Sequence, residues 1–210
     1  MTKSKIQGVY AIVDNSSVPE RGHRELALGL LRGGAKILQL RMKGEDERLV
    51  FQTAREILEL KAAYHFCFIL NDFLEIAREL NLDGYHGGKD DATIETARRL
   101  LGPKKLVGTS VHSLVEAVEA ERRGADYVGF GAVYPSPSKD HEHPVQGVEK
   151  LREVVLALRI PVVALGGLGR DNIEEVLATG VAAVAMITAL VRAPDTVDEA
   201  KFFCQMLANR

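Results

Sequence analysis

The 210-residue sequence has only two cysteines, no long apolar run and almost no excess of either charge. The two cysteines, Cys67 and Cys204, are far apart, which argues against the disulfide framework of small secreted proteins. No apolar stretch reaches the roughly 18 residues that cross a bilayer, and the first residues lack the apolar core of a signal peptide. We therefore expect a cytoplasmic protein that does not span a membrane.

The charge balance excludes a second group of functions. The formal net charge is -2 at pH 7, whereas proteins whose whole surface holds nucleic acid or anionic lipid are strongly basic. Any anion site must therefore be local. We expect no nucleic acid and no membrane as partners, and leave a homo-oligomer open.

Eight short apolar runs alternate with longer amphipathic segments. Near-continuous apolarity is expected of parallel strands that are covered on both faces. The runs are 9–13, 37–40, 66–70, 84–86, 106–107, 127–130, 162–165 and 183–187. Eight β–α units with short connections predict a single (β/α)8 TIM barrel over residues 1–210. An open doubly wound sheet is the alternative, and the count of eight favours the barrel.

Capping pairs predict where several helices begin. A Ser, Thr or Asp followed three residues later by Glu is typical of a helix start. The pairs are Ser113 with Glu116, Asp171 with Glu174 and Thr196 with Glu199.

Polar residues follow the second predicted strand. Catalytic groups of this fold lie where the strands end on one face of the barrel. Gln39, Arg41 and Lys43 alternate along the chain, so they share a face if the strand continues that far. An amide and two cations on one face suit a phosphate-bearing ligand. The competing interpretation is a glutamine inside the barrel and two solvated charges at its rim.

Two aspartates follow the next two predicted strands. Asp72 comes after the third strand and Asp91 after the fourth. Each alone is best read as a helix cap. Together they could share one hard cation, because magnesium prefers few carboxylates and keeps its other positions for water and phosphate oxygens. His86 is expected to pack or form hydrogen bonds rather than to bind a metal.

Hydroxyls and glycines follow the remaining strands. Ser110 after the fifth strand is either a ligand donor or a turn hydroxyl. The polar segment 135–147 carries Ser136, Ser138 and Lys139, and its length favours a mobile loop that closes over the site rather than a surface turn. A Gly-Gly pair at 166–167 and the 187–188 turn lie where barrels of this kind often bind phosphate through backbone N–H groups.

These motifs together resemble the motif series of thiamine phosphate synthases. The motifs lie at 39–43, 71–72, 86–91, 129–139 and 164–168, and their order and spacing match the family over nearly the whole chain. The resemblance implies a magnesium-assisted reaction that joins hydroxymethylpyrimidine diphosphate to a thiazole phosphate and releases diphosphate. It also implies that no protein nucleophile is needed, so catalysis must come from electrostatics and proximity.

The resemblance assigns a role to each matching residue. The implied ligands of the pyrimidine diphosphate are Gln39, Arg41, Lys43, Asn71, Ser110 and Lys139. The implied ligands of the thiazole phosphate are Ser136, Ser138, Gly167, Ile187 and Thr188. Asp72 and Asp91 are the implied ligands of Mg²⁺.

The sequence departs from the family pattern at a few of these motifs, and none of the departures removes a group that the chemistry requires. The departing residues are Phe73 for a basic residue, Gly87 for a larger apolar one, Ala132 for proline, Ser136 and Ser138 for threonine, and Thr188 for serine.

Two other functions remain open. A related thiazole tautomerase would use His112 as its acid–base residue. A non-catalytic barrel that binds thiazole phosphate would need only the last two strand ends. Neither requires the carboxylate pair Asp72 and Asp91 or the cation Lys139, so their presence favours the synthase.

Overall fold

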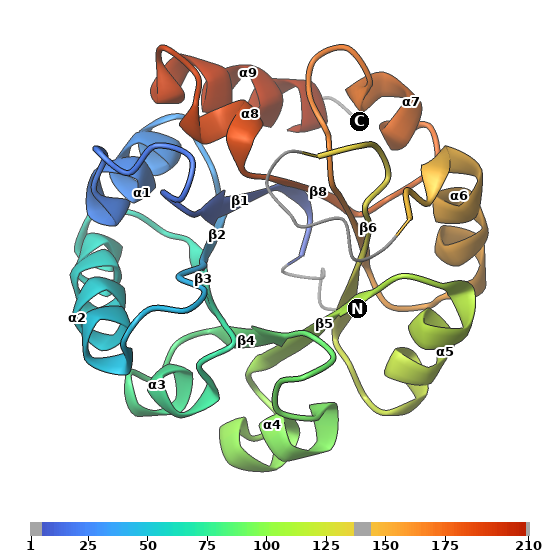
Figure 1. Cartoon of the computed structure of the whole chain (residues 1–210), viewed down its shortest axis with the longest axis horizontal. Coiled ribbons are helices and arrows are strands. Elements are labelled where there is room, and N and C mark those ends of the chain that lie inside the picture. The colour runs from blue at the N-terminus through green and yellow to red at the C-terminus, as the bar shows by residue number, and fades with distance from the viewer. Residues whose placement is uncertain (1–5, 137–143, 209–210) are drawn as a thin grey trace.

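The computed structural model describes residues 6–136 and 144–208. Eight strands pair in sequence order, each parallel to its neighbours, and the last pairs with the first to close a barrel, as Figure 1 shows. The TIM barrel is thus confirmed. The strands are β1 (Gly8–Val13), β2 (Ile37–Leu40), β3 (Cys67–Asn71), β4 (Gly84–Gly87), β5 (Leu106–Val111), β6 (Tyr127–Gly131), β7 (Val162–Leu165) and β8 (Ala183–Met186).

Helices form a ring outside the barrel (Figure 1). Each strand is followed by at least one helix, as expected when every parallel pair needs a crossover. The helices are α1 (His23–Arg32), α2 (Glu47–Leu58), the 3-10 helix η1 (Glu59–Ala62), α3 (Leu74–Glu79), α4 (Ile94–Leu101), α5 (Leu114–Arg122), α6 (Gly147–Ala157), α7 (Ile173–Leu177), α8 (Thr188–Val191) and α9 (Thr196–Ala208).

Most predicted strands differ from the structure at one end or both, and two of the differences bear on the site. The run at 106–107 extends to Val111 in β5, so Ser110 lies within a strand rather than in a turn. The run at 183–187 ends at Met186, and Ile187 becomes the N-cap of α8. The length of β5 was hidden because Gly108, Thr109 and Ser110 interrupt its apolar run.

One predicted helix start is confirmed and two are wrong by one residue. The Ser113 hydroxyl accepts a hydrogen bond from the third backbone N–H of α5. At α9 the cap is Asp195, whose carboxylate accepts two backbone N–H groups, while Thr196 is buried inside the first turn. At α7 the N-cap is Asn172 rather than Asp171.

The apolar side chains form two clusters separated by the barrel wall. The larger cluster fills the layer between the strands and the helices. The smaller one fills the barrel interior and includes Tyr10, Ile69, Tyr127 and Val163. Gly108 makes room for the Tyr127 ring, because a Cβ at position 108 would lie 2.1 Å from that ring. The closed interior leaves the carboxyl ends of the strands as the place for a site.

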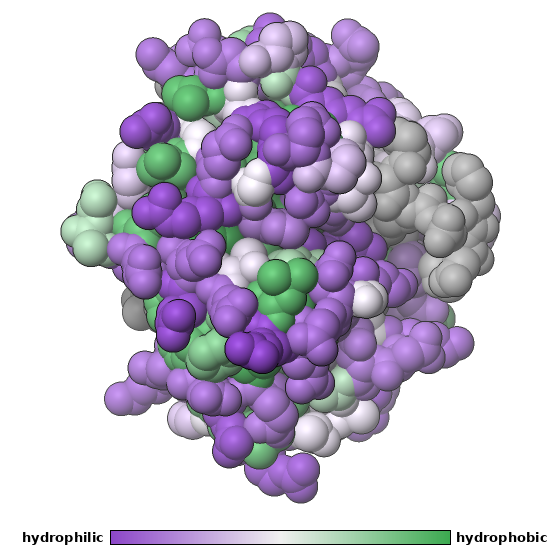
Figure 2. All heavy atoms as spheres, turned by 60° about the vertical axis from the view of Figure 1, so that its left-hand side comes forward, coloured by the Kyte–Doolittle hydropathy of each residue, from purple (hydrophilic) through white to green (hydrophobic). Residues whose placement is uncertain are grey.

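The outer surface is mainly hydrophilic on the side that lies to the left in Figure 1, and its apolar residues are scattered in small groups (Figure 2). No helix among the described residues is long and apolar enough to cross a bilayer.

Candidate active site

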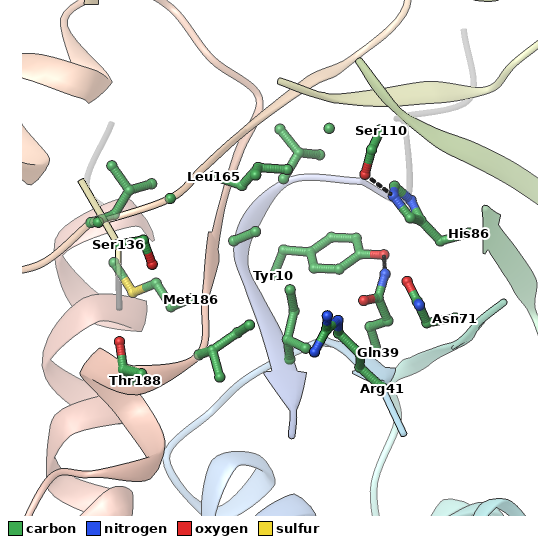
Figure 3. A pocket seen from close by; sticks show the side chains of 18 of the residues that line it. Tyr10, Gln39, Arg41, Asn71, His86, Ser110, Ser136, Leu165, Met186 and Thr188 are labelled. Carbon is green, nitrogen blue, oxygen red and sulfur yellow. Dashed lines mark hydrogen bonds between the residues drawn. The ribbon is translucent and has the colours of Figure 1, made fainter. Parts of the chain in front are cut away.

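A pocket opens at the carboxyl ends of the strands, on the barrel axis (Figure 3). All eight strands or the loops that follow them contribute to it. Its lining comprises Tyr10, Ile12, Gln39, Arg41, Asn71, His86, Ser110, Tyr127, Gly129, Ser136, Val163, Leu165, Gly166, Gly167, Leu168, Ala185, Met186, Ile187 and Thr188.

The polar groups of this pocket gather at two places. Figure 3 shows an amide and cation group on one side, formed by Gln39, Arg41 and Asn71 with Ser110 nearby, and a hydroxyl pair on the other, formed by Ser136 and Thr188. Apolar side chains lie between them. The pocket therefore offers two separate polar ends joined by an apolar middle.

The three residues predicted to share a face behave differently, because β2 ends at Leu40. Gln39 is 3% exposed and its amide Nε2 donates to the Tyr10 hydroxyl at 2.9 Å. Arg41 lines the pocket just beyond the strand. Lys43 lies in the following turn, outside the pocket lining, and is exposed. The shared face thus holds for Gln39 and Arg41 and is wrong for Lys43.

Arg41 is held by a carboxylate that the sequence patterns did not single out. Arg41 Nη1 lies 2.5 Å from Asp14 Oδ2, and the two side chains are 18% and 4% exposed. Burial acts to raise the pKa of Asp14, but hydrogen bonds from Ser16 and the Arg41 guanidinium outweigh it and hold the pKa below its usual value. Asp14 is therefore ionised and fixes the cation at the pocket wall. Its only signal in the sequence is its position directly after β1.

Asp72 and Asp91 face each other beside this cation. Asp72 takes up a left-handed backbone conformation with φ 66°, and the N-cap of α3 is Phe73, so Asp72 is not the helix cap expected of a lone aspartate. Burial, followed by the nearby Asp91 carboxyl, raises the pKa of Asp72 to about 6, although Arg41 and Lys43 act to lower it. Two carboxylates in contact therefore resist ionisation together.

This pair fits a divalent cation better than it fits a capping role. A cation between the carboxylates would remove the repulsion that now favours the protonated form. No cluster of three or more His, Cys, Asp or Glu side chains occurs among the described residues. A two-carboxylate site suits magnesium, which takes its remaining ligands from water and substrate phosphates.

The opposite end of the pocket depends on two glycines after β7. Gly166 and Gly167 have φ values of 95° and 67°. A Cβ on Gly166 would lie 2.5 Å from the Ala132 Cβ, and one on Gly167 would lie 2.4 Å from the Pro135 carbonyl oxygen. The backbone after β7 can therefore pass close to the loop that follows β6 only with glycine at both positions.

Gly87, one of the departures from the family pattern, leaves space that another side chain fills. A Cβ at position 87 would lie 2.6 Å from the Tyr85 hydroxyl and 3.0 Å from its ring. Tyr85 is 1% exposed, and its hydroxyl forms no hydrogen bond of normal geometry with the described residues; a weaker contact with the Ala92 backbone acts to lower its pKa, whereas burial raises it. The Tyr85 ring thus takes the place of the missing apolar side chain and buries a polar atom in doing so.

We expect Tyr85→Phe to raise the free energy of unfolding by about 1 kcal/mol, because a buried hydroxyl without a partner costs about that much or more. Urea unfolding at pH 7 measures the change. Tyr64→Phe, a half-buried tyrosine in the loop before β3, is the matched control. A Tyr85→Phe protein less stable than the parent would show that the hydroxyl does have a partner.

His112 does not take the position expected of an acid–base residue. Its Nδ1 donates to the carbonyl oxygen of Gly131 at 2.6 Å, and the residue is not among those that line the pocket. His86 forms hydrogen bonds as expected, with Tyr127 and Ser110. The hydrogen bonds of Tyr10 and Tyr127 were not predicted from the sequence, because an aromatic residue within an apolar strand is ordinarily a core residue.

Part of the predicted site lies outside the described residues. The structure does not describe residues 137–143. This segment contains Ser138, Lys139 and most of the loop 135–147 that is predicted to close over the site. Their predicted roles therefore stay predictions.

Comparison with known proteins places the chain among enzymes of one kind. The profile of the thiamine monophosphate synthase family matches residues 9–190. Thiamine-phosphate synthase from Pyrococcus horikoshii is 41% identical over 193 residues, which cover 92% of this chain and 90% of the relative. Thiamine-phosphate synthase from Shouchella clausii is 40% identical over 188 residues, covering 89% and 90%.

A solved structure of the same kind of enzyme is also similar to this chain. Thiamine phosphate pyrophosphorylase from Pyrococcus furiosus superposes with a TM-score of 0.87 at 35% identity, covering 98% of this chain and 97% of that one.

Proposed function

This chain belongs to the thiamine monophosphate synthase family, and from that premise we propose that its pocket joins hydroxymethylpyrimidine diphosphate to a thiazole phosphate and releases diphosphate. The activity is that of a thiamine-phosphate synthase, a transferase that acts on phosphorylated small molecules. The observation that carries the proposed chemistry is the pocket itself, with two polar ends on either side of an apolar middle (Figure 3).

The pyrimidine diphosphate binds at the end that contains the cation. Arg41, already fixed by Asp14, faces the diphosphate without having to be ordered first. Gln39, Asn71 and Ser110 surround the pyrimidine portion. Lys43 adds positive charge beside Asp72, and Lys139 would approach from the loop outside the described residues.

Asp72 and Asp91 would hold Mg²⁺, which would neutralise the departing diphosphate. The two carboxylates lie beside Arg41 and Lys43, so negative charge on the leaving group meets positive charge from the protein as well.

The thiazole phosphate binds at the other end. The Ser136 and Thr188 hydroxyls and the backbone at Gly167 and Ile187 line that end, with Ser138 expected to join them. Hydroxyls and backbone N–H groups can hold a phosphate without a positive charge. The serines retain the hydroxyl of the threonines usual in the family and lack only a methyl group.

Catalysis then needs no covalent nucleophile. The C–O bond to diphosphate breaks first, the pyrimidine ring stabilises the resulting carbocation, and the thiazole nitrogen attacks it. The protein aligns the two rings across the apolar middle of the pocket. That apolar middle also keeps water away from the pyrimidine carbocation.

The direct test incubates the protein with both substrates and Mg²⁺ and follows thiamine phosphate by the fluorescence of its oxidised form. We expect product that disappears with EDTA and in Asp91→Asn, while Asp90→Asn, an exposed neighbour, retains activity. No product from folded protein would contradict the proposal, and a tautomerase assay of the parent and His112→Ala would follow. A ligand-binding barrel without catalysis would bind thiazole phosphate equally well with and without Mg²⁺.

The cytoplasmic location, the single domain over residues 1–210 and a homo-oligomeric state stay predictions from the sequence. Gel filtration with light scattering tests the last of these.

A further inference from the structure

Five polar side chains that line the pocket form a continuous hydrogen-bonded chain across the barrel. Gln39 Nε2 lies 2.9 Å from the Tyr10 hydroxyl, which lies 2.8 Å from the Tyr127 hydroxyl. The Tyr127 hydroxyl lies 3.0 Å from His86 Nδ1, and His86 Nε2 lies 3.0 Å from Ser110 Oγ. The five residues come from β2, β1, β6, β4 and β5. Figure 3 labels Gln39, Tyr10, His86 and Ser110, with Gln39 and Ser110 at the two ends of the hydrogen-bonded chain.

The chain has a single direction in which every proton finds an acceptor. Tyr10 accepts from the Gln39 amide, so its own hydrogen must go to Tyr127, the other polar group within reach among the described residues. Tyr127 then accepts from Tyr10 and must donate its hydrogen to His86. With the Gln39 amide nitrogen facing the Tyr10 hydroxyl, any other order leaves a fully buried hydroxyl proton without an acceptor, which costs about 1–3 kcal/mol.

This direction fixes the protonation of His86. Nδ1 accepts from Tyr127, so the ring hydrogen is on Nε2, where it donates to Ser110 Oγ. Ser110 accepts that bond and keeps its own hydrogen for another partner. At the far end, Gln39 uses its amide nitrogen on Tyr10 and has its carbonyl oxygen Oε1 left to accept.

We infer that His86 is a positioning residue that, as the neutral Nε2–H tautomer, presents Ser110 to the ligand as a hydrogen-bond donor, while Gln39 presents a carbonyl oxygen as an acceptor. The inference rests on the proposed function only for the identity of the ligand. A nitrogen heterocycle with a ring nitrogen that accepts and an amino group that donates complements this pair. A ring with a carbonyl in place of the amino group would set two acceptors against each other at Gln39.

The surroundings keep the chain in this state. Tyr10 and Tyr127 are 2% and 0% exposed, and burial is the main cause that raises the pKa of each phenol, so both carry their proton over the working range. His86 is 6% exposed. Gly108 leaves the space that the Tyr127 ring needs to reach His86.

The tautomer is measured directly by NMR on full-length protein labelled with ¹⁵N-histidine. A long-range ¹H–¹⁵N correlation spectrum distinguishes a nitrogen that carries hydrogen from one that does not. We expect His86 to show a bare Nδ1 and a protonated Nε2. His86→Gln assigns the signals by their loss, and Tyr127→Phe assigns them by their shift if the first variant folds poorly. A protonated Nδ1, with or without a proton on Nε2, would overturn the inference whether or not the protein makes thiamine phosphate.

A kinetic cycle tests whether His86 acts through Ser110. His86→Phe keeps a ring but loses both hydrogen bonds, and we expect it to raise KM for the pyrimidine diphosphate about tenfold, the usual value of one hydrogen bond. KM for the thiazole phosphate should not change. His86→Gln can still accept and donate, so it should stay within about twofold of the parent.

The double variant decides between positioning and general destabilisation. His86→Phe added to Ser110→Ala should cost nothing further, because the hydroxyl that His86 orients is already gone. If the double variant showed the product of the two single KM effects, His86 would not act through Ser110. The same conclusion would follow if His86→Phe raised KM equally for the pyrimidine diphosphate and the thiazole phosphate. His65→Gln, on an exposed residue before β3, is the matched histidine control.

Discussion

Replacing Asp72 with asparagine should lower the rate of thiamine phosphate synthesis by about a thousandfold and at the same time make the protein harder to unfold. The loss of rate follows because a metal at a developing charge contributes several kcal/mol, and each 1.36 kcal/mol is a factor of ten. The gain in stability follows because Asp72 and Asp91 repel each other in the folded protein. The uncharged asparagine side chain can occupy the same position without this repulsion.

The sign of the pH dependence separates the two effects. The pKa of Asp72 rises from 3.8 in the unfolded chain to about 6 in the folded protein. Between these values the folded state binds more protons, so stability falls as pH rises from 3.8 to about 6, and the deficit is complete above that. The extra free energy of unfolding of Asp72→Asn should thus be largest above pH 6 and vanish below pH 3.8.

Urea unfolding from pH 3 to 8, without divalent metal, measures this difference. Mg²⁺ should raise the melting temperature of the parent protein and leave that of Asp72→Asn unchanged. Asp90→Asn should match the parent in both respects, since Asp90 is exposed. An Asp72→Asn protein that is less stable than the parent at pH 7 would contradict the repulsion on which the magnesium site is argued.

Arg41→Met should destabilise the protein by about 2 kcal/mol and weaken binding of the pyrimidine diphosphate by about a hundredfold. Removing one partner of a buried ion pair leaves the other charge uncompensated, which costs about 3–5 kcal/mol when both are fully buried. We expect less here because Arg41 reaches the pocket and its side chain is 18% exposed. The affinity falls because a charge-assisted contact to phosphate is lost.

Acid should erase this stability difference. The pKa of Asp14 is held below 3.8 in the folded protein, so its contribution is present above that value and is lost as pH falls through the folded pKa. Parent and Arg41→Met should therefore differ at pH 7 and converge in strong acid. Adding Asp14→Asn to Arg41→Met should restore most of the stability and none of the affinity. Failure of that rescue would show that Arg41 acts through packing rather than through its charge.

The barrel was predictable because its information is local. Strands buried on both faces must be apolar along their length, and each run is short enough to be read directly. The candidate ligands were predictable for a related reason, since this fold brings the ends of successive strands to one face. Gln39, Asn71 and Thr188 line the pocket from strands or loops far apart in the chain.

What could not be predicted depends on contacts between distant segments. Arg41 is held by Asp14, 27 residues away, and Tyr10 meets Tyr127 across 117 residues. No local pattern encodes either pair. Lys43 was misplaced for a smaller reason: β2 stops at Leu40, so the alternation that puts residues on one face does not extend to it.

The sequential order of the eight strands decides when the protein can first work. The pocket takes residues from Tyr10 in the first strand to Thr188 just after the last, and the barrel closes only when β8 pairs with β1. A chain still emerging from the ribosome without its final fifth would hold most of the groups for the pyrimidine diphosphate but lack Ile187 and Thr188, part of the opposite end. The reaction therefore needs the last strand, because the thiazole phosphate end of the pocket is incomplete without Ile187 and Thr188.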